Sequence, residues 1–466
     1  MYEVVEPTPL PEPYLVAFNP DAATLLDLDP SSRRDPAFLE ALAGNRRLPG
    51  SEPLAQAYAG HQFGVWVPQL GDGRAILLGE VTNARGESWD LHLKGAGQTR
   101  FSRFGDGRSV LRSAIREYLA SEALHGLGIP TTRALAIAGS DLPVHRERVE
   151  TAATLLRLAP SHVRFGTFEF FASRGQPDRL RELQDYVITR HFPACSTAQP
   201  PDQGVQFFRE VCHRTARLMA AWMATGFAHG VMNTDNMSIL GITLDYGPYG
   251  FLDTYDRHFI CNHTDTDGRY AYDQQPAIGM WNCARLGEAL MVLDSGVSRE
   301  HPDPDRLGLW QAALESYWPA FTDEYARWMR AKLGLRTEHP GDVELFGELL
   351  AMLQEERRDY TRFFRSLGEA DSDGPHPWYA RYASRLRLEP GDAAERRRGM
   401  QQRNPVYVLR NWIAQEAIER AERKDFGLIE ELRRMLASPC EAHDGMERFA
   451  EPPSAEAREI VVSCSS

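Results

Sequence analysis

The chain has 466 residues and a net charge of −13, with 42% apolar and 25% charged residues. That composition is typical of a globular protein with core enough for two or three structural units. The acidic balance argues against a nucleic-acid partner, and no apolar run approaches the ~18 residues of a membrane span. The N-terminus is proline-rich and acidic, unlike a signal peptide, which favours a cytoplasmic protein. The six cysteines include no C-x-x-C pair, so neither a zinc site nor a disulfide scaffold is expected.

The first half of the chain begins with an extended lead-in and a helix, over residues 1–50. A strand-rich and glycine-rich stretch follows, in which Gly71, Asp72, Gly73 and Arg74 are consecutive. Two apolar runs, 75–81 and 89–94, flank the polar turn 83–87. Such a pattern predicts a β-hairpin.

A loop rich in glycine and arginine, residues 95–108, leads into a predicted helix. Ser109 is expected to cap this helix and Gly126 to end it. Glu117 lies on the apolar face, where a carboxylate needs a partner, and Lys94 is the obvious candidate. The alternative is an exposed glutamate with contacts inside its own helix.

Apolar residues at helical spacing predict a buried helix over residues 205–225. The loop 229–236 follows it. Two short strands, 237–240 and 242–244, are then expected to lead to Asp245. The rest of the chain is predicted to be mainly helical, which makes the fold class α+β.

A strand lysine, a helix glutamate and two oxygen ligands in this order are what a protein kinase uses to hold ATP and magnesium. Lys94 and Glu117 supply the first two. Asn236 and Asp245 offer hard oxygen ligands suited to Mg²⁺ or Mn²⁺, and Asp235 becomes the candidate base. Taken singly, Asp235 and Asn236 would both be interpreted as turn residues.

The loop 229–236, which corresponds to the catalytic loop of kinases and is called the catalytic loop below, departs from the kinase pattern at the position of the general base. Small-molecule kinases of the aminoglycoside type read H-G-D-x-x-x-x-N here, and this chain matches with His229, Gly230 and Asn236. The base position is Val231, which cannot accept a proton, while Asp235 stands beside the asparagine. Either the chain is an inactive kinase, or the nucleophile approaches a different phosphorus atom.

Two further arginines, Arg157 and Arg164, favour the second option. A reaction at the α-phosphorus expels pyrophosphate, which cations must stabilise. Arg74 and Lys94 would add to the same field. The alternative is that these arginines pair with surface carboxylates.

Five segments resemble the selenoprotein O family of kinase-like protein adenylyltransferases. They are residues 55–75, 92–124, 161–169, 229–248 and 259–282. The final Cys464-Ser465-Ser466 is similar to the end of the family, where some members carry selenocysteine. The resemblance implies a bilobal protein-kinase-like fold that binds ATP in a flipped orientation. It also implies transfer of AMP to Ser, Thr or Tyr hydroxyls of proteins. Self-modification by AMP is a separate expectation, which intact-mass analysis would detect.

The resemblance also implies roles for individual residues. Asp235 would accept the proton, Asn236 and Asp245 would hold the metal, and Glu117 would pair with Lys94. The residues implied to lie at the nucleotide are Gly71, Gly73, Arg74, Lys94, Asp106, Gly107, Glu117, Arg157, Arg164 and Asp245.

The expected organisation has four parts. Residues 1–50 form an N-terminal extension, 51–150 a kinase-like N-lobe, 151–300 a C-lobe and 301–466 a C-terminal helical region. Three alternatives to adenylyl transfer stay open: uridylyl transfer from UTP with Mn²⁺, because no residue above reads the base, ordinary phosphotransfer, and an ATP-binding pseudokinase scaffold.

The cysteine close to the end of the chain suggests redox regulation. Chain ends are usually mobile and exposed, so Cys464 is predicted to form a reversible disulfide near the active site. Cys261, shortly after Asp245, is the preferred partner. The alternative is an inert terminal thiol.

Overall fold

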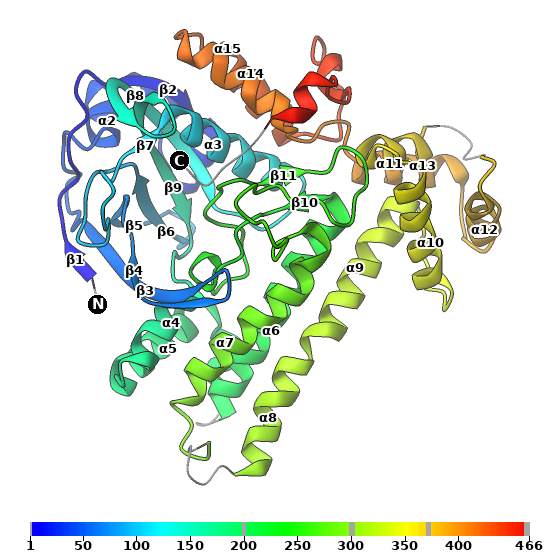
Figure 1. Ribbon diagram of the computed structural model, residues 1–466, viewed down its shortest axis with the longest axis horizontal. Helices are drawn as coiled ribbons and strands as arrows, with labels where there is room; N and C mark the ends of the chain where they lie inside the picture. The colour runs from blue at the N-terminus through cyan, green and yellow to red at the C-terminus, as the bar shows by residue number, and fades with distance from the viewer. Residues whose placement is uncertain (1, 198–201, 298–302, 370–373, 461–466) are drawn as a thin grey trace.

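The computed structural model describes residues 2–197, 202–297, 303–369 and 374–460. An antiparallel sheet built by the N-terminal part packs beside a helical C-terminal part (Figure 1). The α+β prediction is therefore confirmed. None of the described helices combines the length and the apolar character needed to cross a bilayer.

The large sheet has the strand order β1-β3-β5-β6-β9-β8-β2, with β4 paired to β3 and β7 to β9. The predicted hairpin is present as β5 and β6, in which Ala75 is opposite Lys94. Strands β1 and β2, from the lead-in, pair with β3 and β8 and so belong to the sheet. The strands are β1 Tyr2–Val4, β2 Tyr14–Phe18, β3 Leu54–Gln62, β4 Val65–Gly71, β5 Ala75–Thr82, β6 Ser88–Lys94, β7 Ser109–Val110, β8 Arg133–His145 and β9 Val149–Ala159.

Helix α3, Leu111–Gly126, packs against β8 and β9 of the sheet and carries the candidate Glu117. The predicted cap is wrong, because Ser109 is extended in β7 and paired with Ala153 of β9. Val110 precedes the helix without a capping side chain. The helix also includes Gly126, and the glycine in the left-handed region is Gly128, with φ of 75°.

The helical part is organised around α6, which packs against α7, α8 and α9. Its bounds agree with the predicted buried helix, and Gly226 follows it with φ of 75°. The strands β10, Phe227–Ala228, and β11, Gly250–Phe251, pair antiparallel, and the catalytic loop lies between them in the chain. The helices are α1 Pro20–Ala23, α2 Pro36–Leu42, α4 Phe165–Ser173, α5 Pro177–His191, α6 Asp202–Thr225, α7 Gln275–Met291, α8 Pro304–Glu315, α9 Tyr317–Leu333, α10 Asp342–Glu355, α11 Tyr360–Leu367, α12 Pro377–Leu386, α13 Ala393–Arg403, α14 Asn411–Glu422 and α15 Gly427–Ala437.

The prediction of two short strands before Asp245 is wrong. In their place the chain makes two isolated bridges, from Ser238 to Arg164 and from Thr243 to Thr131. Each apolar run meets a single residue of a different segment, so no ladder of strand hydrogen bonds develops. The bridges nevertheless fix the backbone on both sides of this segment before it reaches Asp245.

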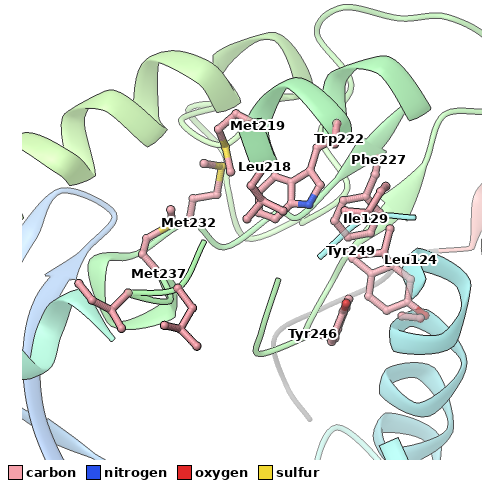
Figure 2. Packing of buried hydrophobic residues seen from close by; sticks show 14 of the residues in the cluster. Leu124, Ile129, Leu218, Met219, Trp222, Phe227, Met232, Met237, Tyr246 and Tyr249 are labelled. Atoms are coloured by element: carbon pink, nitrogen blue, oxygen red, sulfur yellow. The ribbon is translucent and has the colours of Figure 1, made fainter. Parts of the chain in front are cut away.

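The catalytic loop rests on a buried apolar cluster. Figure 2 shows Trp222 of α6 with Met232 and Met237, which flank the short 3₁₀ turn Thr234–Asn236, and with Tyr246, which follows Asp245. The indole Nε1 of Trp222 donates a hydrogen bond to Thr243, at 3.0 Å. Close packing of this kind restricts the backbone that carries the candidate residues.

Candidate active site

A cavity of about 650 Å³ lies between the sheet and the helical part. Seven basic and four acidic side chains line it, so the cavity is positive within an acidic protein, as a triphosphate site requires. Among the predicted residues, those on the cavity wall are Gly71, Gly73, Arg74, Lys94, Asp106, Gly107, Arg157, Arg164, Asp235, Asn236 and Asp245. Of the remaining predicted residues, Glu117 lies behind Lys94, to which it is bonded.

Two glycine positions bring loops together at one side of the cavity. A Cβ atom at Gly71 would lie 2.4 Å from the ring of Phe101. Gly107 has φ of 69°, and a Cβ atom there would lie 2.1 Å from the backbone of Gly97. Only glycine therefore lets the turn after β4 and the 95–108 loop pack this closely.

The expected pairing of Lys94 with Glu117 is present. The Lys94 Nζ lies 2.5 Å from Glu117 Oε2, and both side chains are buried. Burial opposes the charge on each group and lowers the pKa of Lys94. Burial also opposes ionisation of Glu117, but Lys94 and Arg157 outweigh it and lower the pKa of that carboxyl. The charged pair ties β6 to α3 at the cavity wall.

Two arginines converge on Asp245. Arg157 Nη1 lies 2.6 Å from Oδ1, and Arg164 Nη1 contacts Oδ2 and donates to the backbone carbonyl of Asp235 at 2.8 Å. Burial opposes ionisation of Asp245, but Arg164, Arg157 and Lys94 outweigh it and hold the pKa well below its usual range. The alternative of surface ion pairs is therefore wrong for both arginines, which are buried at the site.

The same Arg157 connects the site to a buried histidine. Its Nη2 donates to Nδ1 of His92 at 2.8 Å, so the other ring nitrogen must carry the proton. That Nε2 faces Asp72 Oδ2 at 3.3 Å. Burial, and after it the charges of His162 and Arg157, lower the pKa of His92 to about 4. The histidine is consequently neutral at physiological pH.

The Asp106 carboxylate is held by Arg146, a residue that the sequence analysis missed. The two guanidinium nitrogens donate to its two oxygens at 2.9 and 2.8 Å. Arg146 also lines the cavity. It follows the β8 strand in a charged turn, which from sequence is indistinguishable from a solvated surface turn.

Asp235 is buried at the cavity wall. Burial raises its pKa to about 6, against the opposing charge of Arg164 and a hydrogen bond from Gln62. The Gln62 amide donates to Oδ2 at 3.2 Å, and Oδ1 has no partner among the described residues. A carboxylate with this pKa is suited to accept a proton near neutral pH. Val231 also lines the cavity and offers no such group.

The predicted metal ligands lie on the same cavity wall. The Asn236 amide donates to the carbonyl of Val231 at 3.0 Å, which orients the side chain and leaves its oxygen as the ligand atom. Within the described ranges no group of three or more His, Cys, Asp or Glu side chains is placed to hold a metal. Asn236 and Asp245 therefore fit Mg²⁺ only if phosphate oxygens and water complete the shell, as is usual for nucleotide-bound Mg²⁺.

Cys261 lies behind the catalytic loop and outside the cavity lining. Its Sγ is 3.5 Å from the carbonyl of Ala228, and a Cβ atom at Gly230 would lie 2.6 Å from that sulfur. Cys464 lies outside the described residues. The disulfide between the two cysteines stays a prediction.

Comparison with known proteins bears out the family resemblance. A family model described as "Protein adenylyltransferase SelO" matches residues 1–437. The "Protein nucleotidyltransferase YdiU" of Myxococcus xanthus is 54% identical, over 99% of this chain and 95% of its own length. Proteins of that name from Thioalkalivibrio sulfidiphilus and Thiobacillus denitrificans are 52% and 51% identical, over 99% and 100% of this chain and 95% and 96% of their own lengths. The chain therefore belongs to the SelO family and is an enzyme, a nucleotidyltransferase.

Proposed function

We propose that the protein is a protein adenylyltransferase, which moves AMP from ATP to a Ser, Thr or Tyr hydroxyl and releases pyrophosphate. The observation that carries the proposal is that the candidate general base does not stand at the position that it has in a kinase. Val231 occupies the position where a kinase has its aspartate, and Asp235, with a pKa of about 6, lines the same cavity. The surplus of basic side chains on the cavity wall supports a triphosphate substrate.

The proposal includes a kinase-like arrangement of two lobes around the cavity. A lysine on β6 pairs with a glutamate on α3, and an asparagine and an aspartate from later loops face the same space. These parts follow the order in which a protein kinase uses them. The SelO family match supports the same assignment.

In the proposed reaction the substrate hydroxyl oxygen attacks the α-phosphorus of ATP. A bond forms between this oxygen and the α-phosphorus, the α–β anhydride bond breaks, and the hydroxyl proton passes to Asp235. Pyrophosphate leaves with the electron pair, and fixed cations such as Arg157 and Arg164 stabilise its charge. The α-phosphorus must then lie nearest Asp235, so the triphosphate is reversed relative to a kinase.

A Mg²⁺ or Mn²⁺ ion held by Asn236 and Asp245 would neutralise phosphate charge when bound. The residues of the chain supply the rest. Arg157 and Arg164 hold the Asp245 carboxylate in place, and the hydrogen bond to Val231 orients Asn236. The ligand atoms are thus positioned by the fold before a nucleotide arrives.

Transfer of radioactive label separates the proposal from phosphotransfer. The enzyme is incubated with a protein mixture and ATP labelled either at the α- or at the γ-phosphate. Label from the α position alone should appear on protein, including the enzyme itself. Protein label that comes only from the γ position would overturn the proposal.

Nucleotide preference is tested in the same assay. Uridylyl transfer stays the alternative, because the relatives are named as nucleotidyltransferases in general. Competition of α-labelled ATP with unlabelled UTP, in Mg²⁺ and in Mn²⁺, measures the preference directly. An Asp235→Ala protein serves as the inactive control, and full cellular effect of that variant would favour a binding scaffold instead.

A further inference from the structure

The hairpin of β3 and β4 reaches from the sheet toward the helical part (Figure 1). At its tip, each of the residues 61–63 donates a hydrogen bond to a different residue of the segment 233–235 in the catalytic loop. The three hydrogen bonds are His61 N to Thr234 Oγ1 at 2.8 Å, Gln62 Nε2 to Asp235 Oδ2 at 3.2 Å, and Phe63 N to Asn233 Oδ1 at 3.0 Å. The hairpin thus holds the catalytic loop from the sheet side.

The hairpin is itself fixed against the helical part. The His61 ring nitrogen Nδ1 lies 2.7 Å from a carboxylate oxygen of Glu169 on α4. The backbone also fits closely, because a Cβ atom at Gly60 would lie 2.9 Å from Asp235 Oδ1. A Cβ atom at Gly166 would lie 2.1 Å from the carbonyl of Ala59. The tip has little freedom to move relative to Asp235.

We propose that Gln62 is a positioning residue for Asp235, which its amide holds in the orientation that receives the substrate proton. Within the described part of the chain, Gln62 is the one side chain that donates to this carboxylate. Without it, Asp235 would keep its burial but lose the contact that fixes its side-chain torsion. The inference rests on the proposed function, in which Asp235 is the base.

Replacement of Gln62 should lower turnover and leave nucleotide binding intact. For Gln62→Ala we expect kcat to fall about ten- to a hundredfold, as misplacement of a reacting group by about 1 Å does. The KM for ATP, equilibrium binding of a fluorescent ATP analogue and the Tm should stay close to wild type. Gln62→Glu keeps the volume but replaces the donor by a carboxylate, and should lose as much activity as the alanine variant.

The hairpin offers a matched control. Gln69, on β4, donates to the carbonyl of Leu70 and accepts from Arg174, away from the cavity lining. Gln69→Ala should leave kcat unchanged. An equal loss in both alanine variants would assign the effect to the hairpin as a whole and overturn the role of Gln62.

A double-mutant cycle distinguishes positioning from a separate catalytic or structural effect. In an Asp235→Asn background, Gln62→Ala should cause no further loss of the residual rate, because Gln62 acts through the carboxylate. Independent losses, an unchanged kcat in Gln62→Ala, or a parallel loss of ATP binding and Tm would each overturn the inference. Rates are measured on whichever label the wild-type enzyme transfers, so γ-transfer refutes the proposed adenylyl transfer but still tests Gln62.

Discussion

Asp235 illustrates at the scale of one residue how a site can trade stability for activity. Its folded pKa of about 6 exceeds the ordinary carboxyl value of 3.8. The ionised form therefore destabilises the folded state at neutral pH, by roughly 1–3 kcal/mol. Asp235→Asn should reduce AMP transfer to a small residual rate and yet raise the free energy of unfolding by about that amount.

Urea unfolding and α-label transfer, measured on the same preparations at pH 7, check this prediction. The control is Asp267→Asn, an exposed aspartate in the turn after Cys261, which should change neither quantity. A loss of stability in Asp235→Asn would show that the carboxylate supports the fold and would contradict the argument.

Residue by residue, sequence could identify the side chains that belong to local motifs. Lys94, Glu117 and Asp245 were predicted as site residues from their order and spacing, and the structure brings them together. Gln62 and Arg146 were not predicted from the sequence, because their partners, Asp235 and Asp106, lie 173 and 40 positions away. Such contacts depend on how strands pair in space, which a single sequence does not encode in any local pattern.

At the scale of elements, the hairpin β5–β6 and helix α6 followed from apolar periodicity. The predicted strands before Asp245 failed for a physical reason. Among the described residues neither segment pairs with a strand over more than one residue, since Ser238 and Thr243 each make a single bridge. Apolar alternation predicts burial of one face and leaves open whether a ladder forms.

The segment before Asp245 is instead held by side chains, and Thr243 is central to it. Its hydroxyl donates to the carbonyl of Pro130 at 2.9 Å and accepts from the indole of Trp222 at 3.0 Å. Thr243→Val is nearly isosteric but leaves the buried indole Nε1 of Trp222 without its acceptor, while the Pro130 carbonyl keeps the bond from the Thr243 backbone N–H. We expect it to lower the free energy of unfolding by roughly 1–3 kcal/mol and to reduce kcat, because Asp245 is two residues away.

Thr154→Val is the matched control for this substitution. Thr154 is buried in β9, and its hydroxyl donates to the carbonyl of Leu42 at 2.7 Å, away from the cavity lining. Loss of this hydroxyl should lower the free energy of unfolding by about 1–2 kcal/mol without changing kcat. An unchanged kcat in Thr243→Val would show that the bridges alone position Asp245.

For the whole molecule, the order of the chemical parts along the chain could be predicted, but the extent of the sheet could not. The lead-in was expected to precede the sheet, whereas Tyr14–Phe18 forms strand β2 within it. This strand pairs with β8, more than 100 positions later, so its pairing has no local signal. Strand β2 thereby extends the sheet beyond β8, at the edge opposite to β1.

The buried contacts of His92 predict how the stability of the whole molecule depends on pH. His92 accepts a hydrogen bond from Arg157 and donates to Asp72, which requires the neutral ring. Its folded pKa of about 4 lies below the ordinary 6.5. The unfolded chain therefore binds a proton first as the pH falls, and stability present above pH 6.5 is lost progressively toward pH 4.

The variant His92→Gln isolates this contribution, because an amide can accept from Arg157 and donate to Asp72 without titrating. Between pH 7.5 and 5.0 the wild type should lose roughly 2 kcal/mol more unfolding free energy than the variant. Urea denaturation at the two pH values measures the difference, and other titrating groups cancel because they are common to both proteins. Equal losses would mean that His92 is protonated inside the folded protein, and Arg157 could then not hold Asp245 and His92 together as described.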